Sequence, residues 1–451
     1  MFNRFEFYSN PIHYILFWFI TLIFIGAGLL MLPVSTYKGI HIIDAFFTTT
    51  SAVCVTGLIV LNTAKEFTII GKIIILVLIQ LGGWGVMTFS LGLVFLLGKN
   101  LSLKWRYALE GLYNDTDGIP ILGILIRVIK FTLLIEGITA LFLFFQFRKY
   151  FSFWPAVGHS VFQAVSAFCN AGFSTFSDNL ISFRDNPIIL ISVAIAIIFG
   201  GIGFVVLKEL SRLRFLISKK HEAFSGFSIY TKIVLIVTII LLFLGTVAFF
   251  FLEKENTLQH FGTGQAIVNS FFQSATARTA GFNSINIASL KQSTLLMIMS
   301  LMFIGGAPGS MAGGIKITTI SVVLLLIYSK FKGKEEISLF NRSIDEDTVN
   351  RSLTLFVLAL LFIPLVTFLL LMIHESTQNH SFLQIMFETI SAYGTVGLST
   401  GITAQLSLIE KIIIMGVMLI GRIGLLSIVT AFFLKKKAIS AGYPREMIMI
   451  G

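Results

Sequence analysis

Four short glycine-bearing segments recur along the sequence, and their residues could bind an ion through the main chain. They read Val55-Thr56-Gly57-Leu58, Asn170-Ala171-Gly172-Phe173, Thr279-Ala280-Gly281-Phe282 and Thr395-Val396-Gly397-Leu398, with glycines 115, 109 and 116 residues apart. Glycine adopts positive φ at no steric cost, so consecutive carbonyls of such a segment can point to one side. Four segments around one axis would form rings of oxygens that replace the hydration shell of a monovalent cation.

The cores of these segments contain no carboxylate, whereas a divalent-selective filter is expected to present rings of Asp or Glu. A monovalent ion is therefore favoured. The alternative, tight turns between membrane spans, explains one such loop well but four matched loops badly. The seven histidines lack metal-ligand spacing, Cys54 and Cys169 exclude a disulfide framework, and no nucleophile–base constellation appears. The sequence gives an enzyme little support, and no cofactor is expected.

The composition indicates the environment of these loops. Of the 451 residues, 56% are hydrophobic and only 12% are charged, and the mean hydropathy is +0.91. A soluble domain carries about 25% charged residues, so this chain is expected to be an integral membrane protein. A helix needs roughly 20 apolar residues to cross a bilayer. Eight segments qualify: about Tyr14–Leu32, Ile69–Leu97, Leu122–Phe147, Ile188–Leu207, Lys232–Leu252, Thr294–Tyr328, Ser352–Met372 and Ile412–Leu434.

Shorter, Ser- and Thr-containing stretches precede the glycine loops and are predicted to be re-entrant half-helices. They span Ile40–Ala52, Ala156–Phe168, Thr263–Ala275 and Ser381–Ala392. The first, second and fourth stretches carry Ser-Ala six and five residues before the loop glycine. In the third stretch the Ser-Ala pair lies one residue earlier. A second glycine motif falls in each following span. It reads Gly82-Gly83-Trp84-Gly85, Gly200-Gly201-Ile202-Gly203, Gly305-Gly306 and Gly421-Arg422-Ile423-Gly424.

These repeats predict an all-α polytopic membrane protein of four tandem helix–pore loop–helix units around a pseudo-fourfold pore. The units are residues 1–98, 99–218, 219–332 and 333–451, and the third has a broken second span. Basic residues set the orientation: 21 Lys and Arg lie on the side of the termini and 10 on the other side. Both termini are therefore expected in the cytoplasm. The net charge of +11 is interpreted as a topology signal, with no nucleic-acid partner.

The sixth span is interrupted by a run of helix breakers from Gly305 to Gly314, including Pro308 and Gly309. Proline costs about 3 kcal/mol inside a helix, so this segment cannot continue one. A phosphate-binding loop is an alternative, but Ile315 and Ile317 break its pattern. As a loop of small residues beneath the filter, the segment is a candidate gate. The candidate gate residues are Gly305, Gly306, Gly309, Ser310, Gly313, Gly314, Lys316 and Arg422.

Five ionisable residues within the expected spans and half-helices are singled out. Arg422 should face the bundle interior, since an arginine at a helix centre costs about 2.5–3.5 kcal/mol. It would then act as an electrostatic barrier or bond to free carbonyls. Lys316 would anchor the loop or extend toward the interface. Glu136 is a functional candidate, although an interspan hydrogen bond is the favoured interpretation. Glu388, like Asp44, lies early in a half-helix, where negative charge suits the N-terminus.

The loops, the Gly-Arg-Ile-Gly of the last span and the break in the sixth span resemble the Trk/Ktr/HKT superfamily of potassium-translocating subunits. Eight spans make the chain most similar to the Ktr-type membrane subunits. The resemblance implies a potassium filter of backbone carbonyls and a gating loop at 305–314 with Arg422 beneath the filter. Sodium-preferring plant relatives carry Ser at the first-loop glycine, so Gly57 implies potassium. The implied filter residues are Val55, Thr56, Gly57, Asn170, Ala171, Gly172, Thr279, Ala280, Gly281, Thr395, Val396 and Gly397.

The resemblance also implies the partners: a homodimer in a bacterial cell membrane, seated on a cytoplasmic ring of nucleotide-binding RCK subunits. Sodium is implied as an activator or co-transported ion. The apolar tail Arg445–Gly451 is expected to pack in the dimer or ring interface. Two rival functions stay open from the residues: an ion-coupled permease for an organic solute, and the potassium-binding subunit of an ion-pumping ATPase.

Overall fold

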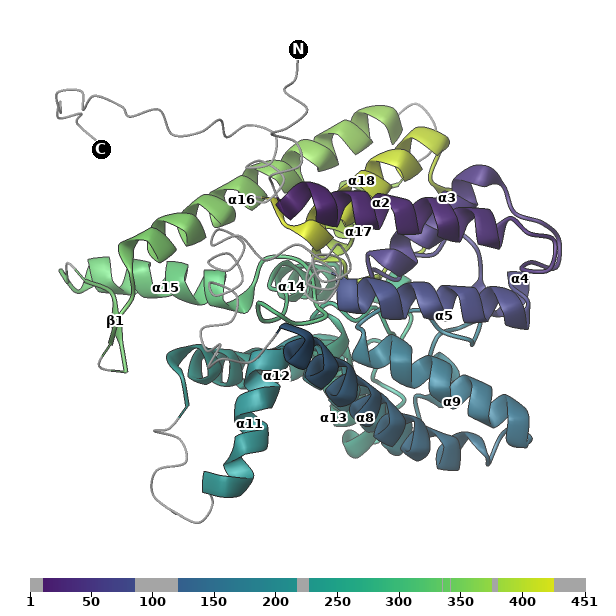
Figure 1. Cartoon of the computed structure of the whole chain (residues 1–451), viewed down its shortest axis with the longest axis horizontal. Helices are drawn as coiled ribbons and strands as arrows, with labels where there is room; N and C mark the ends of the chain where they lie inside the picture. Colours follow the sequence, from purple (N-terminus) through teal and green to yellow (C-terminus); the bar gives the residue numbers. More distant parts are fainter. Residues whose placement is uncertain are drawn as a thin grey trace.

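The computed structural model describes residues 11–85, 121–216, 227–334, 336–340, 342–374 and 380–425. Long apolar helices open four successive parts of the chain (Figure 1): α2 (Pro11–Leu30), α8 (Ile121–Phe147), α12 (Ile229–Glu253) and α16 (Glu346–His374). Among the described residues, four helices are long and apolar enough to cross a membrane, or five if the bent pair α10–α11 counts as one span. The tail Arg445–Gly451 and the ends of the second and eighth expected spans lie outside the described residues.

Each long helix is followed by a shorter one at the place where a half-helix was expected. These are α3 (Ile42–Val53), α9 (Phe153–Phe168), α13 (Thr263–Thr276) and α17 (Phe382–Gly394). Serine hydroxyls help to define some of the helix starts. In α17, Ser381 accepts from the backbone N–H of Gln384 and the Gln384 side chain bonds back, which is a capping box. The helical nature of these stretches is confirmed, with small differences at their ends.

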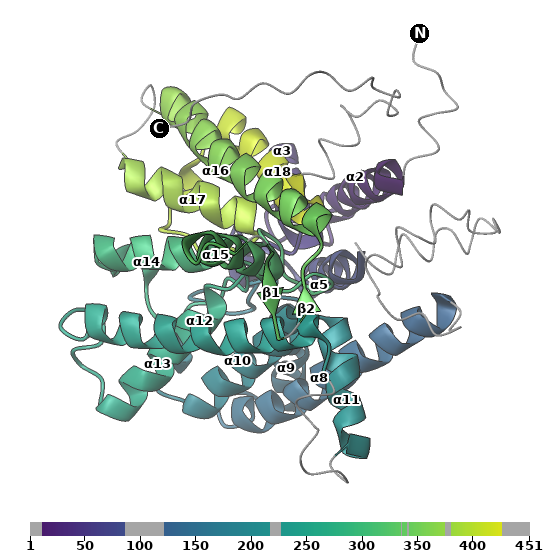
Figure 2. The same cartoon turned by 90° about the vertical axis from the view of Figure 1, so that its left-hand side faces the viewer.

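A further helix of each part returns through the molecule: α5 (Ile69–Trp84), α10 (Pro187–Ile202), α14 (Gln292–Phe303) and α18 (Leu408–Ile423). These helices pack across the boundaries between parts. α5 contacts α9, α10 contacts α13, α14 contacts α17, and α18 contacts α3. The last contact brings the end of the chain back beside its beginning, so the contacts form a closed circle (Figures 1 and 2).

Two expected spans are interrupted at a glycine. The segment Ile188–Leu207 is not one straight helix, because α10 ends at Ile202 and α11 (Phe204–Leu216) leaves it at 102°. The bend follows from Gly203, whose φ of 85° lies outside the helical region. α18 likewise ends at Ile423, before Gly424 at φ 97°. The break in the sixth span is confirmed, because α14 ends at Phe303 and α15 (Ile317–Phe331) begins 14 residues later.

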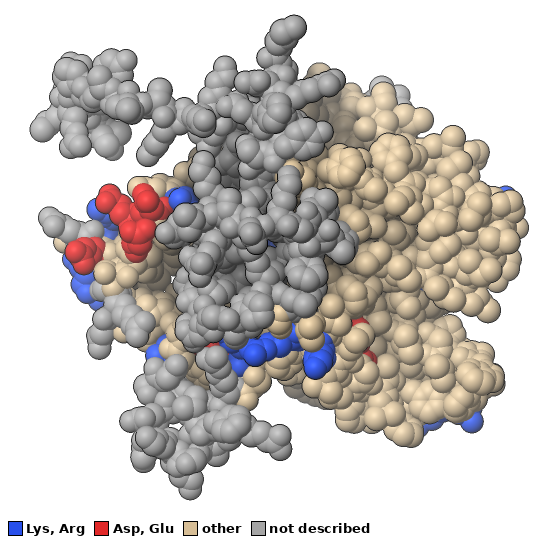
Figure 3. Space-filling model, viewed as in Figure 1, with Lys and Arg blue, Asp and Glu red and all other residues tan. Residues whose placement is uncertain are grey.

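The remaining described elements are short. They are α4 (Thr63–Glu66), η2 (Ile181–Phe183), η3 (Ile287–Ser289), η4 (Thr403–Gln405) and the antiparallel pair β1 (Ser338–Leu339) and β2 (Arg342–Ser343). Charged side chains in Figure 3 gather at the left, where Figure 1 places α15 and β1, and in a row of basic side chains at the lower centre, while the right of the view is largely uncharged. Large apolar side chains on α12 face outward, including Phe243 at 66% and Phe251 at 70% exposed. Such a surface suits lipid.

The second glycine motif marks places where a helix touches the end of a half-helix. A Cβ added to Gly82 would lie 2.0 Å from the carbonyl oxygen of Val53, the last residue of α3. The same construction at Gly200 meets the carbonyl of Phe168 at 1.9 Å. At Gly421 it meets that of Tyr393 at 2.0 Å. Any larger residue would push the half-helix away, so these glycines set the spacing between helix and loop.

Candidate ion pathway

The four predicted filter segments share one unusual backbone conformation. Each glycine has positive φ: 93° at Gly57, 68° at Gly172, 75° at Gly281 and 91° at Gly397. The residue two places earlier is also left-handed in every segment, at Val55 (55°), Asn170 (59°), Thr279 (72°) and Thr395 (48°). Positive φ is rare for non-glycine residues and strained for β-branched ones, so surrounding contacts must hold it. The sequence predicted all of these as filter residues, but it indicated positive φ only at the glycines.

The four glycines lie around a common centre. A Cβ built on Gly57 would lie 2.4 Å from the carbonyl oxygen of Ala171, and one on Gly172 would lie 2.8 Å from that of Ala280. From Gly281 the neighbour is the Val396 carbonyl at 2.4 Å, and from Gly397 it is the Thr56 carbonyl at 2.1 Å. Each segment therefore touches the next, and the fourth touches the first. All four glycines line one cavity of about 420 Å³, which we call the outer vestibule.

Serines of the half-helices hold three of the segments. The backbone N–H groups of Thr56, Ala171 and Val396 donate to the carbonyls of Ser51, Ser166 and Ser391 at 2.7–2.8 Å. The Ser51 and Ser391 hydroxyls also accept from the N–H of their own filter glycines, at 3.0 and 3.1 Å. This explains the recurrent Ser-Ala. The shifted copy behaves differently, because Ser274 donates to the Leu242 carbonyl of α12 at 3.0 Å.

The segment 305–314 forms a loop fastened to the end of α10. Its Ala307 and Met311 N–H groups donate to the carbonyls of Gly201 and Gly200 at 2.9 and 3.0 Å. In return, the N–H of Phe204 in α11 donates to the Gly309 carbonyl at 3.1 Å. The Tyr230 hydroxyl of α12 donates to the Pro308 carbonyl at 2.5 Å. The loop thus contacts the residues on both sides of the 102° bend between α10 and α11.

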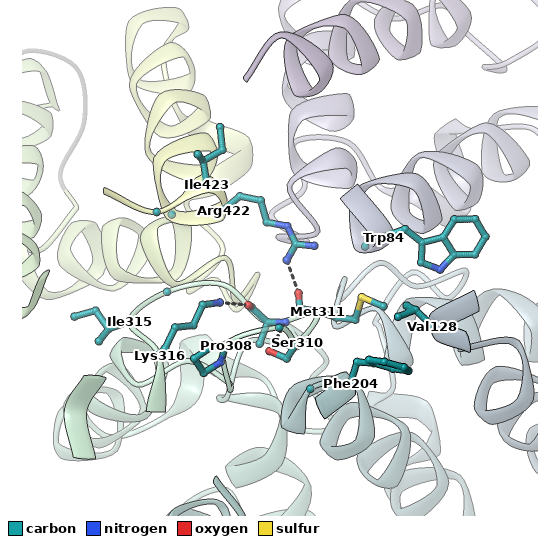
Figure 4. A pocket seen from close by; sticks show the side chains of 18 of the residues that line it. Trp84, Val128, Phe204, Pro308, Ser310, Met311, Ile315, Lys316, Arg422 and Ile423 are labelled. Atoms are coloured by element: carbon teal, nitrogen blue, oxygen red, sulfur yellow. Dashed lines mark hydrogen bonds between the residues drawn. The ribbon is translucent and has the colours of Figure 1, made fainter. Parts of the chain in front are cut away.

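A buried arginine and a half-buried lysine bond to carbonyls of this loop (Figure 4). The Arg422 guanidinium, on the last turn of α18, donates to the Met311 carbonyl and to the Gly82 carbonyl of α5, the latter at 2.8 Å. The Lys316 ammonium donates to the Ala312 carbonyl at 2.6 Å. Arg422 therefore connects the loop with helices α18 and α5. The bond of Lys316 is the anchor whose partner the sequence could not identify.

The loop and the cations line a second cavity of about 380 Å³. Gly83, Tyr393 and Arg422 lie on its wall together with residues 308–312 of the loop. Gly313 of the loop also reaches the filter segments, since a Cβ there would lie 2.2 Å from the Thr395 hydroxyl. The structure therefore places the loop between this inner cavity and a filter segment.

The interhelical bond expected at Glu136 is confirmed. On α8 this buried carboxyl accepts from the Gln80 side chain of α5 at 3.4 Å and from the Cys169 thiol at 3.8 Å. Cys169 follows the last residue of α9 and directly precedes a filter segment. Among the described residues, Asp44 of α3 forms an ion pair with Lys411 of α18 at 2.7 Å. No sequence signal pairs these residues, which lie far apart in the chain.

Comparison with known proteins identifies the family of this chain. The family model described as cation transport protein (TrkH) matches residues 9–441. The chain is 39% identical over 435 residues to Ktr system potassium uptake protein B of Bacillus subtilis, covering 96% of this chain and 95% of that protein. It is 37% identical over 448 residues to potassium/sodium uptake protein NtpJ of Enterococcus hirae, covering 98% and 97%.

A solved structure shares the fold. The potassium transporter TrkH from Vibrio parahaemolyticus superposes with a TM-score of 0.74 at 18% identity, covering 94% of this chain and 84% of that one. The likeness at this identity concerns the fold alone. The family model and the relatives of similar length decide the affiliation: the chain belongs to the TrkH family of cation transport proteins.

Proposed function

We propose that this chain takes up potassium through a selectivity filter made of four backbone segments, each from one of four tandem units with two spans. The observation that carries the proposal is the closed contact of Gly57, Gly172, Gly281 and Gly397 around one cavity. Eight spans around a pseudo-fourfold axis account for the circle of helix contacts. The unit boundaries are those expected from the sequence, 1–98, 99–218, 219–332 and 333–451.

Potassium is favoured by the chemistry and by the relatives. Main-chain oxygens replace the hydration shell of a monovalent cation without carboxylates, and the filter segments supply no carboxylate. The half-helices α3, α9, α13 and α17 end at the filter, so their negative ends favour a cation there. Relatives of similar length carry names of potassium uptake proteins. Neither the filter chemistry nor the names of these relatives supports a permease for an organic solute.

The loop at 305–314 is proposed as the gate of this pathway. It borders the inner cavity and bonds to Arg422 and Lys316, so moving it requires breaking these bonds. Arg422 both holds the loop and places a positive charge below the filter. A cation leaving the filter inward meets that charge while the loop is fastened.

The partners are carried over from the resemblance as proposals. A homodimer on a cytoplasmic ring of nucleotide-binding RCK subunits would regulate the gate, with sodium as activator or co-transported ion. The location is a bacterial cell membrane with both termini in the cytoplasm. α11 is the described segment best placed to transmit such a signal, because its first N–H bonds to the loop.

Growth of a potassium-uptake-deficient bacterium on micromolar potassium tests the function. We expect the chain, expressed with an RCK partner, to restore growth. Restoration by an organic solute but not by potassium would instead support a permease.

Gly57→Ser tests the filter. A Cβ at Gly57 meets the Ala171 carbonyl at 2.4 Å, so the segment must shift, and sodium should enter more readily. The measurement is the ratio of potassium to sodium uptake in vesicles. An unchanged ratio rejects the filter assignment.

Shortening the loop 305–314 tests the gate. Potassium flux in the absence of the RCK partner should rise, and a flux equal to that of the native chain would contradict the gate.

A further inference from the structure

A carboxylate is buried directly behind the outer vestibule. Glu388, on α17, is 1% exposed. It accepts hydrogen bonds from the Ser399 hydroxyl, from the Thr403 hydroxyl at 3.0 Å and from the backbone N–H of Thr400. An ionised carboxylate only accepts hydrogen bonds; the Thr400 N–H can only donate and both hydroxyls are able to donate, so this shell can satisfy the charged form.

The donors around Glu388 form the wall of the vestibule. Ser399, Thr400 and Thr403 line the same cavity as the filter glycine Gly397. The carboxylate therefore lies one layer of polar groups away from the space in which an ion approaches the filter. Ser391, one helical turn further along α17, accepts from the N–H of Gly397. α17 thus holds both the filter segment and the carboxylate beside it.

Glu388 has no cationic partner in the parts of the chain that the structure describes, where its bonds are those to Ser399, Thr400 and Thr403. Two other carboxylates differ from Glu388 in pairing or in burial. Asp44 is paired with Lys411, whereas Asp178, on the vestibule wall, is only half-buried and accepts from the N–H and the hydroxyl of Ser182. Buried charges are normally paired or bound to metal ions. A cation in the vestibule would supply the missing opposite charge.

The second unit contains the same arrangement with a neutral residue. Gln163 lies nine residues before Gly172, as Glu388 lies nine before Gly397. Its side-chain amide donates to the Ser174 hydroxyl at 2.6 Å. Ser174 accepts from the N–H of Phe176 at 3.1 Å, just as Ser399 accepts from that of Gly401 at 2.9 Å. The remaining units have Thr48 and Phe272 at this position.

We infer that Glu388 determines the affinity of the outer vestibule for the transported cation, while its twin Gln163 serves the structural part of the same arrangement. The charge attracts a cation to the filter entrance, and the hydroxyls of Ser399 and Thr403 keep the carboxylate from reaching it. This inference rests on the proposed potassium pathway. It adds a positioned charge to a filter built otherwise from the main chain.

Glu388→Gln tests the charge, because glutamine has the same shape and already fills the equivalent place in the second unit. The full chain with its RCK partner is reconstituted in vesicles, and initial potassium uptake is measured against potassium concentration. We expect the half-saturating concentration to rise about fivefold with the maximal rate nearly unchanged. The rise should shrink when choline chloride raises the ionic strength. A change in the maximal rate alone would indicate a structural role and overturn the inference.

Gln163→Glu provides the matched variant. An added charge at the twin position should lower the half-saturating concentration, and the double variant Glu388→Gln, Gln163→Glu should return it toward the native value. If Glu388→Gln does not accumulate in the membrane, the half-saturating potassium concentration of Gln163→Glu tests the inference instead. If both single variants keep the native half-saturating potassium concentration, while the native chain takes up potassium and Gly57→Ser alters the ratio of potassium to sodium uptake, the inference about Glu388 is overturned and the proposed function stands. Absence of potassium uptake by the native chain would instead reject the proposed function.

Discussion

The filter segments and the inner cavity differ in how far the four units resemble one another. At the filter, four left-handed residues and four glycines adopt matching φ angles, and each segment touches the next. Around the inner cavity the units diverge. α10 bends by 102° at Gly203, α14 gives way to a loop, and α18 carries Arg422 in place of a glycine.

The difference has a physical reason. A dehydrated ion is bound well when oxygens surround it evenly, so the residues that shape the main chain must match in every unit. A gate needs elements that can move separately, and a single loop or a single charge suffices for that. The four units therefore share one backbone conformation where an ion would bind and can differ in structure around the inner cavity.

Gly397→Ala should break the closed ring and produce the largest effect. At φ 91°, its added Cβ would lie 2.1 Å from the Thr56 carbonyl, so the first and fourth segments could not keep their contact. We expect potassium uptake to fall at least about tenfold. Gly416→Ala in α18 is the control, because nothing lies within 4 Å of its added Cβ. Equal uptake by both variants would contradict the ring.

Arg422→Gln tests the divergent side. Loss of the guanidinium removes its bonds to the Met311 and Gly82 carbonyls and removes the positive charge below the filter. Uptake in the absence of the RCK partner should rise about tenfold, since a charged hydrogen bond contributes about 1.5–3 kcal/mol. Arg351→Gln, at an exposed position of α16, serves as control. Reduced or equal uptake would show that Arg422 does not keep the pathway closed.

Ser51→Ala and Ser274→Ala sharpen the comparison among the units themselves. The Ser51 hydroxyl accepts from the Gly57 N–H at 3.0 Å, whereas Ser274 bonds to the Leu242 carbonyl outside the filter. Losing the first bond, worth about 1 kcal/mol, should reduce the preference for potassium over sodium about two- to fivefold. The second substitution should leave this preference as it was. Competitive rubidium uptake against sodium measures both, and the reverse ranking would be inconsistent with the hydrogen bonds.

The smallest effect is expected at the contact between the first and last units. Asp44 and Lys411 join α3 to α18 at 2.7 Å, and their side chains are 13% and 14% exposed. Asp44→Asn should lower the stability by about 0.5–1 kcal/mol without changing selectivity. Thermal unfolding of the purified protein in detergent measures it. A double-mutant cycle with Lys411→Met that gives purely additive losses would show that the pair contributes nothing.

Particular residues show how far the sequence reached. The half-helices, the filter glycines and the loop between α14 and α15 were predictable, because each depends on local composition and on repetition along the chain. The bend at Gly203 was not, since glycine within an apolar run also occurs inside helices. Positive φ at Val55 and Thr279 contradicts their local preference and is held by neighbouring segments.

By itself, the sequence determined the membrane environment, the fourfold recurrence and the places where helices break, since these follow from hydropathy and from backbone freedom. The tertiary structure alone decided the partners: Arg422 with the loop, Ser51 with Gly57, and Glu388 with hydroxyls and no cation among the described residues. Hydropathy and backbone freedom are properties of short stretches. A hydrogen bond joins atoms that the folding of the whole chain brings together. The residues around a donor in the sequence therefore do not indicate which distant acceptor it will meet.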